Sequence, residues 1–275
     1  MNNQNDIFKV GLIQMTSSDV IEDNIKSAEA LIREAAARGA NFVLTPEMTT
    51  LFDADSKSVT DMICSEADDT SWRHFAALAG ELNIWLLLGS IAIKEGDKAA
   101  NRSFLFSPEG EKVVSYDKIH MFDVDLPGEK PYRESNAYQA GDKAVIADLP
   151  WGKVGLSICY DLRFPYLYRM LSQAGAIMLT VPAAFTYVTG KAHWHTLLKA
   201  RAIENGAYVF APAQGGDHAN GRKTYGHSLI IDPWGNVLGD GGEKPGVTLA
   251  EIDTKKVLEA RNRIASLTHD KNVAI

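Results

Sequence analysis

Cysteine is scarce in this chain, as are the features that mark secreted or membrane-spanning proteins. Only two cysteines, Cys64 and Cys159, occur in 275 residues, too few for a disulfide-stapled secreted scaffold. The N-terminal residues lack a basic segment followed by an apolar one, so no signal peptide is expected. The longest apolar run, residues 84–93, is about half the length of a membrane-spanning helix. We therefore expect a cytoplasmic protein with reduced thiols and no membrane partner.

Positive charge is also in short supply. The chain has 28 lysines and arginines against 35 acidic residues, a formal net charge of -7. This balance gives no general attraction to phosphate backbones, so no nucleic-acid partner is expected. The glycine pairs at residues 215–216 and 241–242 do not open a helix after a strand with the spacing of phosphate-binding or dinucleotide-binding loops. No cofactor is predicted.

Strand-like and helix-like segments alternate along the chain. The patterns predict strands at residues 8–15, 41–45, 84–93, 103–106, 113–116, 155–158, 177–181, 208–211, 227–232 and 247–252. They predict helices from Asp23-Asn24 to Gly39, at 71–81, 164–173 and 194–205, and from Thr254 onward. No linker rich in Pro, Gly or Ser divides the chain. We expect one α/β domain over residues 1–275, with sheets covered by helices.

Cys159 occupies an informative place in this pattern. The segment VGLSICYDLRFP puts it on the last position of a buried strand, immediately before a sharp entry into a helix. A thiol at such a corner can be held rigidly, and a following backbone N–H can face a developing oxyanion. An isolated cysteine is more often a small buried hydrophobe. The polar residues Tyr160, Asp161 and Arg163 that follow favour a lined pocket instead.

Two charged side chains lie at other strand ends. Lys118 follows a strand in VVSYDKIH, and Glu47 follows Pro46, which fixes the backbone before it. Taken alone, each is more often a surface charge. Hydrolysis of an amide needs a nucleophile, a base that passes its proton to the departing amine, and a cation at the oxyanion. Cys159, Glu47 and Lys118 together supply these three roles.

Longer segments carry a resemblance to a known family. LTPEM, YDKIH and GLSICYDLRFP resemble the three motifs of the carbon-nitrogen hydrolase, or nitrilase, superfamily, and the similarity runs from KVGLIQM to SLIIDPWGNVL. DVDLPG, YRES, TGKAHW, KARAIEN and YGHS resemble the branch of omega-amidases and deaminated glutathione amidases, and CYDLRFP with AFTYVTGKAHW favours the latter. The resemblance implies a four-layer α-β-β-α sandwich, usually paired into a homodimer through helices that include the one after the nucleophile.

The resemblance also implies a catalytic set. Glu47, Lys118 and Cys159 would form a Glu-Lys-Cys triad, with Glu134 of YRES near Lys118 and the reacting amide. The backbone N–H of Tyr160 would help to hold the oxyanion. The expected reaction converts the carboxamide of a small carboxylate-bearing molecule to an acid plus ammonia through a cysteine thioester. Deaminated glutathione is the expected substrate.

Substrate carboxylates require cationic partners. The candidates beside the motifs are Arg133, Arg163, Lys191, Arg222 and Lys223, and Phe185 and Thr186 are further candidates for the pocket wall. Each cation is equally well explained as an ordinary surface charge or a structural ion pair. Arg163 is expected to bond within its own loop.

The histidines do not predict a metal site. His193 and His195 lie two residues apart on an expected helix and so face different directions. His218 and His227 follow at spacings that match none of the usual zinc patterns. At His195 this chain reads AHWH where the family pattern commonly reads AHWE, which leaves a detail of that helix open.

Several other functions are compatible with these residues. An omega-amidase acting on α-ketoglutaramate, a nitrilase and a hydrolase of carbamoylated amines would use the same triad, so only the pocket lining separates them. A papain-like hydrolase is not supported, because the surroundings of Cys159 differ from that family's. A catalytically silent binding protein of the same fold is expected to have lost a triad member, and none is missing.

Overall fold

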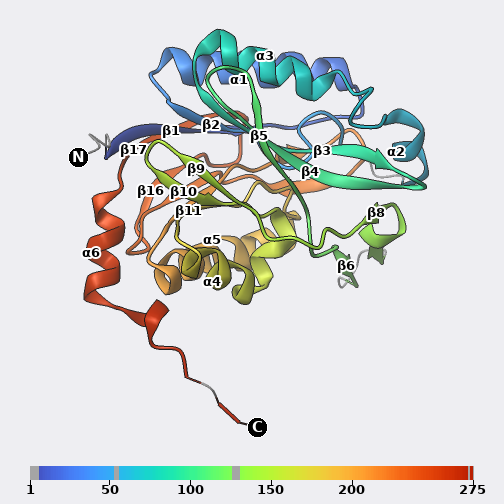
Figure 1. Cartoon of the computed structure of the whole chain (residues 1–275). Helices are drawn as coiled ribbons and strands as arrows, with labels where there is room; N and C mark the ends of the chain where they lie inside the picture. Colours follow the sequence, from blue (N-terminus) through green and yellow to red (C-terminus); the bar gives the residue numbers. More distant parts are fainter. Residues whose placement is uncertain (1–5, 53–55, 126–130, 272, 275) are drawn as a thin grey trace.

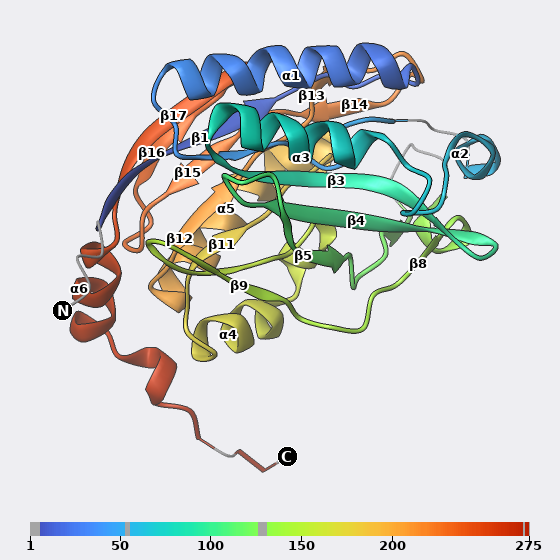
Figure 2. The same cartoon turned by 45° about the horizontal axis from the view of Figure 1, so that its top comes forward.

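Two β-sheets pack face to face, and each carries helices on its outer face (Figure 1). The computed structural model describes residues 6–52, 56–125, 131–271 and 273–274. Helices α1 (Ile21–Ala37) and α3 (Ser71–Leu82) lie on one side of the pair of sheets, and α4 (Pro165–Gln173) and α5 (Tyr187–Asn205) lie on the other, as Figures 1 and 2 show. The expected α/β, four-layer α-β-β-α sandwich is confirmed.

The first sheet has seven strands and is mostly built from the N-terminal half of the chain. In spatial order its path runs through β17 (Gly246–Asp253), β1 (Ile7–Gln14), β2 (Phe42–Leu44), β3 (Trp85–Glu95), β4 (Lys98–Phe106) and β5 (Lys112–Asp117), and β8 (Tyr138–Gln139) pairs with β4. The β4–β5 hairpin is the predicted one, and β17 returns from the C-terminal region to pair antiparallel with β1.

The second sheet has six strands and comes from the C-terminal half. Its order is β16 (Val237–Asp240), β15 (Leu229–Ile231), β12 (Tyr208–Ala211), β11 (Ala176–Thr180), β10 (Gly152–Gly155) and β9 (Ile146–Leu149). Two short ribbons lie apart from the sheets and are formed by β13 (Gly215–Asp217) with β14 (Lys223–Tyr225) and by β6 (Asp123–Val124) with β7 (Tyr132–Arg133).

Five further helical segments are described. They are α2 (Ser56–Met62), α6 (Lys255–Arg263) and the 3-10 turns η1 (Glu134–Asn136), η2 (Cys159–Arg163) and η3 (Ser266–Thr268). Figure 1 shows α6 and the segment after it descending along one side of the sandwich. Within the part of the chain that the structure describes, no helix is both long and apolar enough to cross a bilayer.

Both faces of the central strands are buried, which explains why their sequences are apolar without alternation. In β2, Phe42 and Leu44 belong to the core between the sheets, whereas Val43 faces the helices of the outer layer. Helix α1 contributes Ala28 and Ile32 to that outer core. The two cores fix the separation of the sheets, so the loops at the strand ends have defined positions.

Two local predictions were wrong in instructive ways. The strand predicted at residues 155–158 is β10 at Gly152–Gly155, and Cys159 begins η2 instead of ending a strand. The reason is that the Asp161 carboxylate accepts the N–H of Ile158 at 2.8 Å and replaces a strand partner.

The cap predicted at Asp23-Asn24 is also absent, because α1 already begins at Ile21. The Asn24 side chain bonds the N–H of Ser18 and the carbonyl of Thr50 instead.

Gly89 permits the close approach of β3 to the turn that carries Glu47. A Cβ atom on Gly89 would lie 1.9 Å from the carbonyl oxygen of Thr45 and 2.5 Å from that of Pro46. The Gly89 N–H also donates to the Thr45 hydroxyl at 2.9 Å. No side chain fits here unless the backbone of the turn moves.

We therefore expect Gly89→Ala to lower the free energy of unfolding by about 3 kcal/mol, at the upper end of the range for overpacked sites. Urea denaturation followed by circular dichroism measures this change. Gly80→Ala is the matched control, since the nearest atom outside its own helix, the Gly110 nitrogen, would be 3.4 Å from the new Cβ and alanine is the better helix former. Equal stability of the two variants would contradict the steric explanation.

Candidate active site

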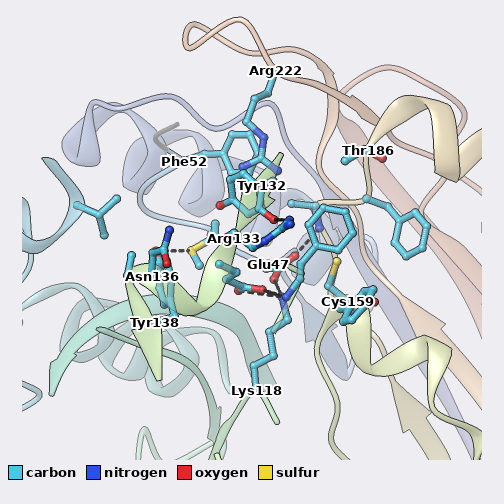
Figure 3. A pocket seen from close by; sticks show the side chains of 18 of the residues that line it. Glu47, Phe52, Lys118, Tyr132, Arg133, Asn136, Tyr138, Cys159, Thr186 and Arg222 are labelled. Atoms are coloured by element: carbon cyan, nitrogen blue, oxygen red, sulfur yellow. Dashed lines mark hydrogen bonds and ion pairs between the residues drawn. The ribbon is translucent and has the colours of Figure 1, made fainter. Parts of the chain in front are cut away.

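Four polar side chains from four separate segments line one cavity, and Figure 3 labels three of them, Glu47, Lys118 and Cys159. Glu47 follows β2, Lys118 follows β5, Glu134 opens η1 and Cys159 opens η2. All four are at least nine-tenths buried, with 2% of Lys118 exposed and 7% of Cys159. The residues predicted as a catalytic set therefore share one site.

The Lys118 ammonium is bracketed by two carboxylates. Its Nζ donates to Oε1 of Glu47 at 3.0 Å and to both oxygens of Glu134 at 2.9 and 2.8 Å. Burial works against its charge, but the facing carboxylates of Glu134 and Glu47 raise the pKa of Lys118 well above its usual value. The lysine is therefore a permanent, immobile cation at neutral pH.

Glu47 remains ionised although it is buried. Burial alone would raise its pKa, but the Lys118 charge, hydrogen bonds from Cys159 and Lys118, and the N–H of Ala184 outweigh burial and lower it. The Ala184 N–H donates to Oε2 at 2.8 Å, so the two carboxylate oxygens are anchored on opposite sides. A buried carboxylate held in this state is poised to accept a proton.

The pKa of the Cys159 thiol shifts in the opposite direction from that of Glu47. Burial and the negative charge of Glu47 raise its pKa well above the usual range, and the Lys118 charge and the Ala184 N–H compensate only in part. The resting pair is therefore a neutral thiol beside an ionised carboxylate. Cys159 also has a φ of 47°, a left-handed conformation that non-glycine residues rarely adopt. The turn thus presents its sulfur at a sharp corner.

Asn101 completes the buried cluster and was not predicted. Its Nδ2 donates to Oε1 of Glu47 at 2.9 Å and approaches Oε1 of Glu134 at 3.3 Å. The amide therefore lies between the two carboxylates that share Lys118. The signal in the sequence was an amide inside an otherwise apolar strand, KAANRSFLF, where a buried polar group needs a partner.

Asp161 holds the turn that carries the thiol. It is fully buried and accepts hydrogen bonds from the Ile158 N–H, the Tyr116 hydroxyl at 2.6 Å and the His120 N–H at 3.0 Å. This network connects η2 to the end of β5, which Lys118 directly follows. The position of the nucleophile relative to the cation is therefore set by a third carboxylate outside the pocket.

The cluster forms one wall of a cavity of about 230 Å³. The cavity is rich in aromatic rings, and those that line it belong to Phe52, Phe122, Tyr132, Tyr138, Tyr160 and Phe185. Such a cavity can enclose a small ligand while its polar groups orient that ligand.

The predicted substrate contacts separate into two groups. Arg133, Phe185, Thr186 and Arg222 line the cavity, whereas Arg163, Lys191 and Lys223 do not. Lys191 is exposed on α5, so its predicted contact with a substrate is not supported. Arg163 lies near the His193 ring at 3.3 Å and packs over the Tyr160 and Phe185 rings. Arg163 therefore contacts two rings that line the cavity without lining it itself.

Arg133 and Arg222 differ in what they already bind. The Arg133 guanidinium is paired with both oxygens of Asp125, at 2.8 and 2.9 Å. Arg222 lies over the Phe52 and Tyr132 rings, 4.6 and 4.9 Å from their centroids (Figure 3). No acidic side chain among the described residues forms an ion pair with Arg222. It is therefore the cation best placed to receive an anionic ligand.

Comparisons with known proteins find relatives along almost the whole chain. Residues 9–262 match the family model described as carbon-nitrogen hydrolase. A deaminated glutathione amidase of Synechocystis sp. is 43% identical over 95% of this chain and 97% of its own, and the mouse omega-amidase NIT2 is 37% identical over 94% of both chains. The crystal structure of the C. elegans NitFhit protein superposes with a TM-score of 0.90 at 36% identity, and covers 96% of this chain. This chain spans only 65% of NitFhit.

The bracketed lysine makes a prediction about stability. Lys118→Met leaves two buried carboxylates without a cation, which we expect to cost about 3–5 kcal/mol of unfolding free energy at pH 7. The pKa of Glu47, now lowered, would then rise above its unfolded value, so protonation would favour the folded state. The deficit should therefore shrink as the pH falls from 7 to about 5, as urea unfolding across this range would show.

Lys112→Met is the matched control. Lys112 pairs with Glu66 at a partly exposed position, where an ion pair contributes up to about 1 kcal/mol. If Lys118→Met lost as little unfolding free energy as Lys112→Met, or if its loss did not change with pH, Lys118 would not be the cation that compensates the two buried carboxylates.

Proposed function

The chain belongs to the carbon-nitrogen hydrolase family and is an amide-hydrolysing enzyme, and on that premise we propose that Cys159, Glu47 and Lys118 are its catalytic triad. One observation carries the proposal. Cys159 lies in the same cavity as the ionised Glu47, whose Oε1 accepts a hydrogen bond from the Lys118 ammonium at 3.0 Å. A nucleophile, a base and a cation are thus gathered in one buried site, and no further group is needed to start the reaction.

The acylation half begins with proton transfer. Glu47 takes the thiol proton as Sγ bonds to the amide carbon, and the carbonyl π electrons move to oxygen. Lys118 and the backbone N–H of Tyr160 hold this oxyanion. Glu47 then passes the proton to the amide nitrogen, the C–N bond breaks, and a thioester to Cys159 remains.

The deacylation half repeats these roles with water. Glu47 removes a proton from the water as its oxygen attacks the thioester carbon, and collapse of the second oxyanion breaks the C–S bond. The proton returns to Sγ and the carboxylic acid departs. Glu134 lies beside Lys118, and its two hydrogen bonds keep the ammonium aimed at the reacting centre throughout.

We propose that the substrate is a small amide that carries a carboxylate, with deaminated glutathione as the first choice. Two features support it: the name of relatives 38–43% identical to this chain, and Arg222 facing the cavity without an acidic partner among the described residues. A guanidinium over aromatic rings binds a carboxylate through paired N–H groups. The amide nitrogen of deaminated glutathione belongs to a cysteine residue, so the leaving group there is an amine and not the predicted ammonia.

The α-ketoglutaramate alternative is supported by the size of the cavity. A volume of about 230 Å³ suits a five-carbon amide, which releases ammonia, and the mouse relative is named an omega-amidase. Deaminated glutathione would have to extend its dipeptide part across the rim, where Arg222 and Thr186 lie.

The same premise extends to assembly and location. We propose a homodimer through the outer face of α4 and α5, where Tyr166 and Met170 are 59% and 48% exposed and Val188 and Ile203 are exposed as well. Exposed apolar side chains on neighbouring helices are typical of subunit contacts. Two unpaired thiols, Cys64 and Cys159, support location in the reducing cytoplasm.

Cys159→Ala should abolish turnover without loss of the fold. We expect kcat to fall by at least about 10⁴-fold, as for other covalent nucleophiles, with an unchanged far-ultraviolet circular dichroism spectrum. Cys64→Ala is the matched control, because it removes an exposed thiol outside the cavity and should keep full activity. Amine or ammonia release that survives in Cys159→Ala would overturn the triad.

Arg222→Gln tests the substrate class. We expect kcat/KM for deaminated glutathione or α-ketoglutaramate to fall about 10–100-fold, since a hydrogen bond to a charged group contributes about 1.5–3 kcal/mol. Hydrolysis of a neutral amide of similar size should change little. Lys191→Gln, outside the cavity, is the control and should match the parent protein. Equal losses on charged and neutral amides would contradict a carboxylate contact.

A further inference from the structure

Three potential metal ligands meet at the end of the second sheet, away from the cavity lining. They are His195 on α5, His227 just before β15, and Asp240 at the end of β16. One ligand atom from each lies within 4.8 Å of the other two. None of the three lines the cavity that contains Cys159, so the proposed amidase function does not use them.

The separations suit a small cation. Nδ1 of His227 lies 2.8 Å from Oδ1 of Asp240, and Nε2 of His195 lies 3.3 Å from Oδ2. A tetrahedral ion about 2.0–2.1 Å from each donor keeps the donors about 3.3 Å apart. The separation from His195 to Asp240 already has this value, and that from His227 to Asp240 is 0.5 Å shorter (3.3 against 2.8 Å).

The surroundings hold two of the ligands in place. The Gly242 N–H donates to the Asp240 carboxylate at 2.9 Å, and the His227 N–H donates to the Gly242 carbonyl at 2.6 Å. The His227 ring stacks on Tyr225, with centroids 4.4 Å apart. Its backbone has a left-handed φ of 54°, fixed further by the Trp194 indole N–H at its carbonyl oxygen. Such outer contacts are typical of metal ligands that must keep one orientation.

We propose that His195, His227 and Asp240 bind one transition-metal cation of the zinc type, with solvent completing the coordination. Two imidazoles and one carboxylate are the ligand types that Zn²⁺, Co²⁺ and Ni²⁺ accept. The three side chains are between 20% and 36% exposed, so an ion can reach them and water can share the site.

The sequence predicted no metal site because it could compare the histidines only along the chain. His193 and His195 do point to different partners, since His193 lies beside Arg163. The fold instead brings His195 to His227 and Asp240, which are 32 and 45 residues away. A bound ion would join α5 to the segments of His227, before β15, and Asp240, in β16.

Titration calorimetry with Zn²⁺, and the visible absorption of Co²⁺, test the site in the full-length chain. Cys64→Ser and Cys159→Ser are combined as the background so that thiols do not compete for the ion. We expect one tightly bound ion per chain and a higher melting temperature in its presence. His195→Gln should weaken binding at least about tenfold, since loss of even an outer partner of a ligand costs 10–100-fold.

His74→Gln is the matched control, because His74 pairs with a single carboxylate, Glu29, and should leave the affinity unchanged. Asp240→Asn provides a second test of the same site if His195→Gln unfolds. Binding lost in these two variants and kept in His74→Gln supports the proposal. Absence of binding, binding that survives in His195→Gln and Asp240→Asn, or equal weakening in His74→Gln overturns it and leaves a metal-free ion-pair cluster.

Discussion

The contact of one buried ammonium with two buried carboxylates is the constraint on which the site depends. Lys118 donates to Glu47 and to both oxygens of Glu134, at 2.8 to 3.0 Å, in a place that excludes almost all solvent. Burying any one of these charges alone would be very unfavourable. Together they keep Glu47 ionised beside a neutral thiol. In this protonation state the carboxylate can accept the thiol proton when the sulfur attacks a substrate.

The rest of the fold serves to hold this contact. Both cores fix the sheets so that the segments after β2, β5 and β10 arrive at one place. Gly89 lets the turn before Glu47 lie against β3, and Asp161 binds the turn that presents Cys159. Asn101 then separates the two carboxylates. Each of these residues acts through position and contributes no chemistry of its own.

Much of this arrangement could be predicted because it is encoded locally. The apolar runs located nearly every central strand, and the motif segments identified Glu47, Lys118, Glu134 and Cys159, which the structure brings together. The boundary at Cys159 could not be predicted, since it depends on whether the Asp161 carboxylate or a strand partner binds the Ile158 N–H. Contacts between residues from distant segments could not be predicted from the sequence either. Asn101 beside Glu47, and Arg222 over Phe52 and Tyr132, follow from three-dimensional packing that no spacing along the chain reveals.

The central claim is that the free enzyme holds Cys159 as a thiol and Glu47 as its base, with Lys118 fixed between the carboxylates. The most direct test is the ultraviolet absorbance of thiolate as a function of pH, taken as the difference between the parent chain and Cys159→Ala so that Cys64 cancels. The account predicts no Cys159 thiolate at neutral pH or at the ordinary cysteine pKa of about 8.5, because burial and Glu47 raise the pKa of this thiol. A thiolate already formed near pH 7 would contradict it and would make Lys118, in place of Glu47, the group that activates the nucleophile.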